Sequence, residues 1–152
     1  MTSPQPDIQR LSADDIPIMR ALLAILGKAF GEMDNYTGAQ PDDHYLRRLL
    51  SGGQFIALAA LARDEVIGGL AAYELQKFEQ ARSEIYIYDL AVDETWRRRG
   101  IATALIDALR AIARERGAWV IYVQADPPDA PAMALYTKLG TREDVCHFDI
   151  GV

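Results

Sequence analysis

The middle of the chain constrains the fold more than any other region. An apolar run at residues 84–92 is followed by a short basic turn, and helical spacing then holds over residues 100–116. Gly117 ends that helical pattern, and the apolar run at residues 119–123 is typical of a buried strand. A strand, a helix and a second strand in this order predict two parallel strands with a helix packed across them.

The remaining elements are predicted from periodicity and turn signals. Residues 8–11 are extended, and amphipathic helices follow at residues 15–30 and 42–50, with a polar loop at residues 31–41 between them. Two strands joined by a tight turn occupy residues 55–61 and 66–75. A short helix at residues 130–139 and a last strand at residues 143–150 complete the pattern. We expect one α/β domain over residues 1–152, built on a mixed sheet.

Composition narrows the classes of function. A net charge of -6 and a pI near 4.9 argue against nucleic-acid binding and favour cationic partners. The sequence has one cysteine, Cys146, and two histidines, so we expect neither an internal disulfide nor a metal site. We interpret Cys146 as a small apolar residue of a strand rather than as a nucleophile. No signal-like segment opens the sequence, and no apolar run would span a bilayer. We expect a cytoplasmic protein without a membrane partner, and a homodimer is compatible with the sequence.

The basic turn before the long helix is suited to a phosphate group. The N–H groups at a helix start lack internal partners, and the helix dipole favours an anion there. Gly100 and Ala102 permit close approach, and Arg97, Arg98 and Arg99 add positive charge. The sequence contains neither a P-loop nor a Gly-x-Gly-x-x-Gly motif. The alternative interpretation is a basic, solvated helix cap.

Two segments resemble the GNAT acetyltransferases. Residues 97–102 match the family signature Q/R-x-x-G-x-G/A, after a strand that ends in Leu-x-Val. Residues 134–140 resemble A-x-x-L-Y-x-x-x-G, with the small residues slightly shifted. The resemblance implies acetyl-coenzyme A as co-substrate. It also implies a mixed sheet of about six to seven strands flanked by about four helices, in which two strands splay apart at the acetyl-coenzyme A site. It assigns coenzyme binding to Leu90, Ala91, Val92, Arg97, Arg98, Arg99, Gly100, Ile101, Ala102 and Thr103.

A narrower resemblance is to the GNAT-type aminoglycoside 3-N-acetyltransferases. Residues 55–60, 77–80, 83–92, 121–126 and 147–150 carry it. It implies transfer of an acetyl group to the 3-amino group of the central deoxystreptamine ring of an antibiotic, and hence resistance. An acetyltransferase for a polyamine or protein amine remains the alternative, as does a catalytically silent coenzyme A-binding domain.

Two residues are candidates for the proton transfers. Strand alternation places Asp89 on one face with Ile85, Ile87 and Ala91. A carboxylate among apolar residues should have a raised pKa and act as a base towards an ammonium group, although Asp89 could instead bind a backbone N–H at a bulge. The family resemblance implies that Tyr136 is the general acid that protonates the coenzyme thiolate. The alternative for Tyr136 is a core aromatic residue on its helix.

A polycationic acceptor calls for carboxylates around the site. The candidates are Glu79, Glu84, Asp126 and Asp149, with Asp34, Asp42 and Asp43 as further possibilities; each could equally be a solvated surface charge. The family often has Asn near the start of the last helix, whereas this chain has a proline-rich segment at residues 127–131. That departure leaves the pantetheine contacts at this point open.

Overall fold

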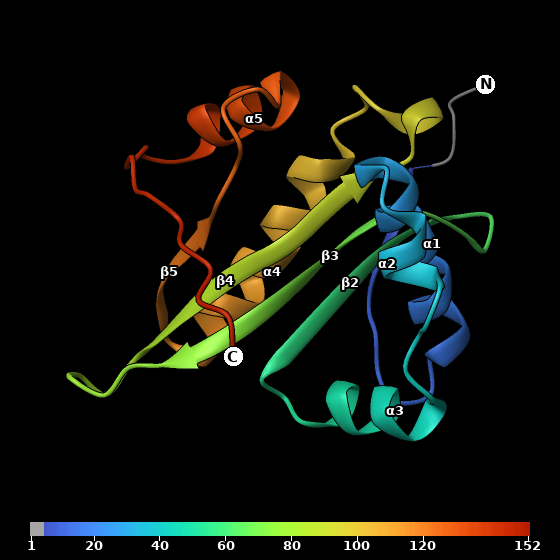
Figure 1. The fold of residues 1–152 in the computed structure, drawn as a ribbon, viewed down its shortest axis with the longest axis horizontal. Coiled ribbons are helices and arrows are strands. Elements are labelled where there is room, and N and C mark those ends of the chain that lie inside the picture. The colour runs from blue at the N-terminus through green and yellow to red at the C-terminus, as the bar shows by residue number, and fades with distance from the viewer. Residues whose placement is uncertain (1–4) are drawn as a thin grey trace.

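A five-stranded sheet organises the chain, with its strands in the order β1-β2-β3-β4-β5 (Figure 1). The computed structural model describes residues 5–152. All neighbouring strands are antiparallel except β4 and β5, which are parallel. The elements are β1 Asp7–Arg10, α1 Ile16–Phe30, α2 Met33–Thr37, α3 Asp43–Ser51, β2 Phe55–Ala62, β3 Glu65–Gln76, β4 Ser83–Val92, a 3-10 turn Glu94–Trp96, α4 Ile101–Arg116, β5 Ala118–Val123 and α5 Ala130–Leu139.

Helices cover the two faces of the sheet with separate apolar cores (Figure 1). On one face α4 buries Leu105 and Leu109 against the strands. On the other face α1 and α3 bury Leu22, Leu26 and Leu46. α1 packs so closely against the sheet that a Cβ added at Gly69 of β3 would lie 2.5 Å from Leu22 Cδ1. Among residues 5–152, no helix is both long and apolar enough to cross a membrane.

Most of the predicted elements are confirmed, including the parallel strand–helix–strand unit. The expected mixed α/β class is confirmed, although the sheet of residues 5–152 has five strands rather than about six to seven. The expected last strand at residues 143–150 does not form, since no other strand of the described chain pairs with it. β5 is an edge strand rather than a buried one, and Trp119 is 52 % exposed. Within the expected loop at residues 31–41, the chain forms the short helix α2.

Candidate active site at the splay between β4 and β5

β4 and β5 separate near the end of β5. Their pairing ends at Ile87 and Val123, while β4 continues to Val92. The backbone of β4 beyond Ile87 therefore has no strand partner on its β5 side within residues 5–152. Val92 O accepts a bond from Arg97 Nε (3.2 Å). The splay leaves backbone polar groups available to a ligand that enters between the strands.

A β-bulge at Tyr88 reverses the faces of β4 just before the splay. Ala71 of β3 pairs with Asp89, and the adjacent Ala72 pairs with Ile87, so Tyr88 is an extra residue. Ile85 and Ile87 pack on the α4 side, whereas Ala91 packs on the α1 side. The prediction that Asp89 shares a face with Ile85 and Ile87 is therefore wrong. The bulge directs Asp89 towards α1 and α2.

Asp89 is half-buried and is held by a tyrosine from α2. Tyr36 Oη donates a hydrogen bond to Asp89 Oδ2 at 2.7 Å. Burial raises the pKa of Asp89, the bond from Tyr36 lowers it, and the nearby Glu32 carboxylate raises it, with a net upward shift. The pKa of Tyr36 is raised as well, first by burial and then by Asp89, so its hydroxyl remains a donor at neutral pH. This arrangement fits a carboxylate that accepts a proton.

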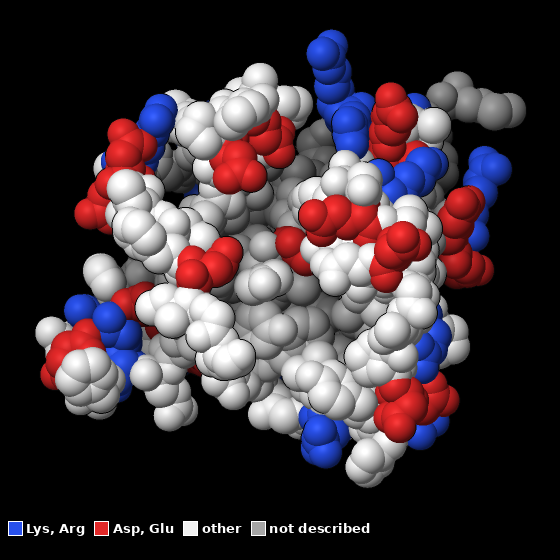
Figure 2. All heavy atoms as spheres, viewed as in Figure 1, with Lys and Arg blue, Asp and Glu red and all other residues white. Residues whose placement is uncertain are grey.

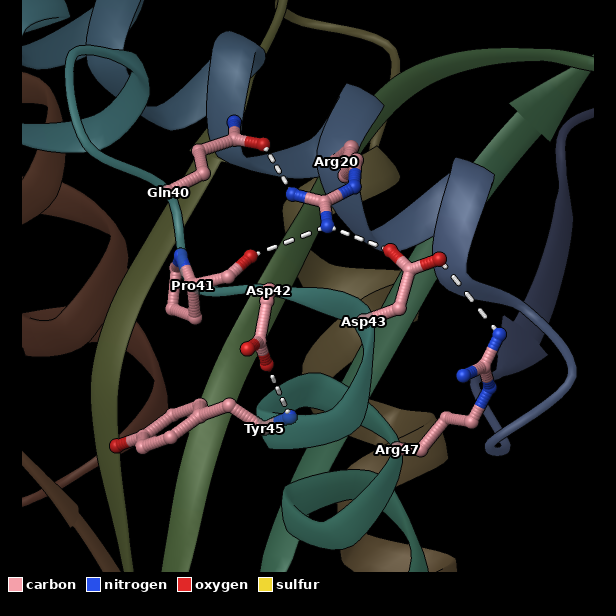
Figure 3. A network of polar contacts seen from close by, with 7 residues as sticks. All are labelled: Arg20, Gln40, Pro41, Asp42, Asp43, Tyr45 and Arg47. Atoms are coloured by element: carbon pink, nitrogen blue, oxygen red, sulfur yellow. Dashed lines mark hydrogen bonds and ion pairs between the residues drawn. The ribbon is translucent and has the colours of Figure 1, made fainter.

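Arg20 of α1 holds the segment that follows α2, the helix that carries Tyr36, through three polar contacts (Figure 3). Arg20 of α1 donates to Gln40 Oε1 at 2.8 Å and to Pro41 O at 3.1 Å, and it binds Asp43 Oδ1 at 2.7 Å. Gln40 Nε2 in turn donates to Tyr36 O at 3.2 Å. Sequence reasoning missed Tyr36, because a five-residue helix has too little periodicity to stand out from a polar loop.

Tyr136 lies on α5 beside the splay. It lines a groove together with Ile87 and Val123, the last paired residues of the two strands. Burial, with a smaller effect of Asp129, raises the pKa of Tyr136 to about 12, so the hydroxyl is protonated at neutral pH. The proline-rich approach to α5 contains its own cap, since Asp129 Oδ1 accepts from Ala132 N at 3.2 Å.

The start of α4 has no side-chain cap. Gly100 is the N-cap residue with φ of 76°, and no side chain accepts from the first N–H groups of this helix. By contrast, Asp42 caps α3 and Asp129 caps α5. Arg98 also has a positive φ, 62°, so the turn that leads into α4 is tightly coiled. An uncapped N-terminus of a sixteen-residue helix with basic neighbours is a suitable place for a phosphate group.

The acidic candidates divide into two groups in space. Glu79 and Glu84 lie at the β3–β4 hairpin, at the other end of β4 from Asp89, and both bind Lys77. The structure therefore separates these two carboxylates from Asp89, and their role in substrate binding stays a prediction. Likewise Asp43 binds Arg20 and Asp42 caps α3.

The other acidic candidates are exposed. Asp126 follows the splay end of β5, Asp34 is on α2, and Asp149 is in the tail, where it contacts His147 at 2.8 Å. Figure 2 shows acidic side chains on both sides of the hollow at the centre of this face, over α2 and over the segment around α5. Within residues 5–152, no group of three or more His, Cys, Asp or Glu side chains could hold a metal ion, and Cys146 is exposed.

A row of aromatic rings crosses four strands of the sheet. Ring centroids are 5.2 Å apart for Phe55 and Tyr73, 5.9 Å for Tyr73 and Tyr88, and 5.8 Å for Tyr88 and Tyr86. Tyr86 then stacks on Tyr122 of β5 at 4.7 Å. Such rings offer apolar faces, and they attract cations as well.

The family model for acetyltransferases of the GNAT family matches residues 19–141. The chain belongs to the acetyltransferase (GNAT) family. Members of this family transfer an acetyl group from acetyl-coenzyme A to an acceptor amine. An N-alpha-acetyltransferase of Sulfurisphaera tokodaii is 31 % identical over 96 residues, which are 56 % of this chain and 58 % of that protein. The matches to curated relatives cover between 28 and 58 % of the length of those proteins.

Two solved structures of acetyltransferases from uncultured soil metagenomic samples are similar over nearly the whole chain. One aminoglycoside acetyltransferase is 58 % identical, with a TM-score of 0.96, and the match covers 98 % of this chain and 99 % of that chain. Another, solved in complex with sisomicin, is 34 % identical with a TM-score of 0.89, and the match covers 97 % and 96 % of the two chains.

Proposed function

We propose that this chain is an acetyl-coenzyme A-dependent N-acetyltransferase that acts on aminoglycosides and so confers resistance to them. The observation that supports this most is the half-buried Asp89, bound to Tyr36 beside the splay with the Glu32 carboxylate nearby. Acidic side chains also border the hollow at the centre of the face shown in Figure 2. A polycationic sugar would find negative charge around this hollow and aromatic rings on the sheet. The similarity to solved aminoglycoside acetyltransferases supports the same substrate class.

Each residue of the site has a part in this proposal. The N-terminus of α4 and Arg97–Arg99 would bind the pyrophosphate of the coenzyme, and the backbone N–H groups of Leu90–Val92 that face away from β3 would bind the pantetheine and the thioester. Asp89 would remove the proton from the acceptor ammonium, so that the amine lone pair attacks the thioester carbonyl carbon. Tyr136 would donate its proton to the departing thiolate.

Attack by the 3-amino group is the finer part of the proposal. It rests on the sequence segments shared with the 3-N-acetyltransferases of this family. A polyamine or a protein N-terminus is the second candidate acceptor, and the match to an N-alpha-acetyltransferase supports it. A cytoplasmic location also belongs to the proposal.

A thiol-release assay with acetyl-coenzyme A tests the substrate class. We expect turnover with gentamicin-like aminoglycosides and faint release with spermidine or with peptides that have a free N-terminus. NMR of the product would then show whether the acetyl group is on the 3-amino nitrogen. Release with peptides or polyamines alone would reject the antibiotic as the substrate, and acetylation at another nitrogen would reject only the regiochemistry.

A further inference from the structure

Tyr36 occupies one of the two carboxylate oxygens of Asp89 and leaves the other accessible. The Tyr36 hydroxyl donates to Oδ2 at 2.7 Å, and no hydrogen bond within residues 5–152 engages Oδ1. Among the buried side-chain nitrogens and oxygens of the described chain, Arg82 Nε alone lacks a partner, so Oδ1 is not sealed from solvent. A carboxylate held at one oxygen and accessible at the other has a defined atom for proton transfer.

The short helix that carries Tyr36 lies directly on α1. A Cβ added at Gly27 of α1 would lie 3.0 Å from Tyr36 Cβ and 3.2 Å from Met33 Sδ, both in α2. Just before α2, the backbone N–H of Glu32 donates to Gly27 O at 2.8 Å. The rings of Phe30 and Tyr36 add a further contact, with 6.0 Å between their centroids. Packing this close leaves α2 little freedom to move towards or away from β4.

The titratable groups around Asp89 act on it in opposite directions. Glu32 disfavours the charged carboxylate and raises its pKa, whereas the hydrogen bond from Tyr36 lowers it. Tyr73 of β3 and Tyr86 of β4 have raised pKa values, caused first by burial and with smaller contributions that include Asp89. The titratable side chains coupled to Asp89 or to Tyr36 are thus Glu32, Tyr36, Tyr73, Tyr86 and Tyr88. The pKa of Asp89 should therefore respond with opposite signs to the loss of Tyr36 and to the loss of Glu32.

We propose that Tyr36 is a positioning residue of acetyl transfer: it binds Oδ2 of Asp89 so that Oδ1 takes the proton, and Gly27 sets its reach by letting α2 lie against α1. In this step an N–H bond of the acceptor ammonium breaks, an O–H bond forms at Oδ1, and the electron pair stays on the nitrogen for the attack. The inference rests on the proposed role of Asp89 as the base, and it holds for any acceptor amine.

Tyr36→Phe removes the hydroxyl and keeps the ring against α1. Loss of a hydrogen bond to the carboxylate should raise the pKa of Asp89, so the acidic limb of kcat/KM should move up by about one pH unit or more. We expect kcat at neutral pH to fall about tenfold, because the base is no longer held in place, and the KM for acetyl-coenzyme A to change by less than about twofold. Tyr45→Phe is the matched control: it removes a hydroxyl from an exposed tyrosine of α3 and should leave the profile and kcat unchanged.

The direction of the shift separates a lost hydrogen bond from a general loosening of the site. A loosened site would admit water to Asp89, and better solvation lowers the pKa of a carboxyl group. Tyr36→Phe should instead raise that pKa, and Glu32→Gln should lower it because a like charge is removed. Carbon-13 NMR titration of the aspartate carboxyl groups measures both shifts, and the signal of Asp89 is identified by its absence from Asp89→Asn.

Gly27→Ala tests the packing of α2 on α1 without touching the base. Alanine favours a helix more than glycine does, so α1 should stay folded. The added methyl group should push α2 away, because it would lie 3.0 Å from Tyr36 Cβ, and the acidic limb should move up by less than in Tyr36→Phe. Gly52→Ala is the matched control, since a Cβ there would lie 3.5 Å from Arg48 O, an ordinary contact at the end of α3.

Two results would overturn the inference. One is a pKa of Asp89 that is unchanged or lower in Tyr36→Phe, and the other is an acidic limb that stays in place although this pKa rises. A wild-type protein that releases no thiol with aminoglycosides would reject the proposed substrate instead. In that case the carboxyl titration, and the pH profile with whichever amine is acetylated, still test the role of Tyr36.

Discussion

The contact between Tyr36 and Asp89 determines the chemistry that this carboxylate can perform. The bond supports the charged form of Asp89, while burial and Glu32 disfavour that form more strongly. Because the pKa is raised in the folded state, the folded protein binds this proton more tightly than the unfolded chain does. The free energy of unfolding therefore falls as the pH rises through the shifted pKa, and ionised Asp89 reduces stability at neutral pH.

Replacing Asp89 by asparagine should separate activity from stability. We expect turnover to fall by about 10²-fold or more, because a general base contributes on this scale. The acidic limb of the profile of kcat/KM against pH should vanish as well, since below its pKa the wild-type carboxyl is protonated and cannot accept a proton. The Tm at neutral pH should stay equal or rise, because the buried charge is gone.

The control for this variant is Asp107→Asn, which changes an exposed carboxylate of α4. Its pH profile should match the wild type. An Asp89→Asn enzyme that keeps the wild-type acidic limb would show that another group is the base and that Asp89 is structural.

Whole elements were predictable where periodicity is long and strong, and unpredictable where a neighbour determines the outcome. The spacing of apolar residues was sufficient for α1 and α4. The bulge at Tyr88 is invisible in the sequence, because one extra residue in β4 leaves the pattern of residue types unchanged while it reverses the side of Asp89. A strand also needs a partner, which is why alternation in the tail predicted a strand that the single chain does not form. Asp89 and Tyr136 were thus proposed from sequence, whereas Tyr36 could be recognised only in the structure.

The uncapped start of α4 leads to a prediction about coenzyme binding. A Cβ at Gly100 would meet nothing within 4 Å, so Gly100→Asp places its carboxylate in open space at the end of the helix, where the pyrophosphate is proposed to bind. Affinity for coenzyme A should fall by about tenfold or more through repulsion of the phosphates. Isothermal titration calorimetry would measure this loss.

Gly117→Asp provides the strain control. Gly117 ends the same helix with φ of 71°, close to the 76° of Gly100, and it too has open space at its Cβ. Both variants should lose about 1–2 kcal/mol of stability, because a side chain is disfavoured in left-handed backbone. Only Gly100→Asp should weaken coenzyme binding. Equal affinities in the two folded variants would show that the pyrophosphate does not bind at the start of α4.

The charge of the whole molecule is uneven in a way that suits a cationic substrate. The net charge is -6, and acidic side chains border the central hollow on both sides (Figure 2). The β3–β4 hairpin carries no net charge, because Glu79 and Glu84 are balanced by Lys77, which binds both, and by Arg82. The field that attracts a cation to the hollow should therefore come from its own border.

Binding of an aminoglycoside should consequently depend strongly on ionic strength. Several exposed ion pairs would hold the polycation, and salt screens such pairs over about 8 Å at physiological concentration, so the KM for the drug should rise steeply with added salt. A peptide with a single amine offers fewer charges, and its KM should rise much less.

Asp126→Asn, beyond the end of β5, should raise the KM for the drug more than the KM for acetyl-coenzyme A. Glu79→Gln is the matched control. Glu79 lies on the β3–β4 hairpin and already binds Lys77, with 2.8 Å between Glu79 Oε1 and Lys77 Nζ. Steady-state kinetics at several salt concentrations would measure all of these values. A drug KM that is independent of salt would mean that the aromatic rings and apolar contacts, rather than the acidic border, bind the acceptor.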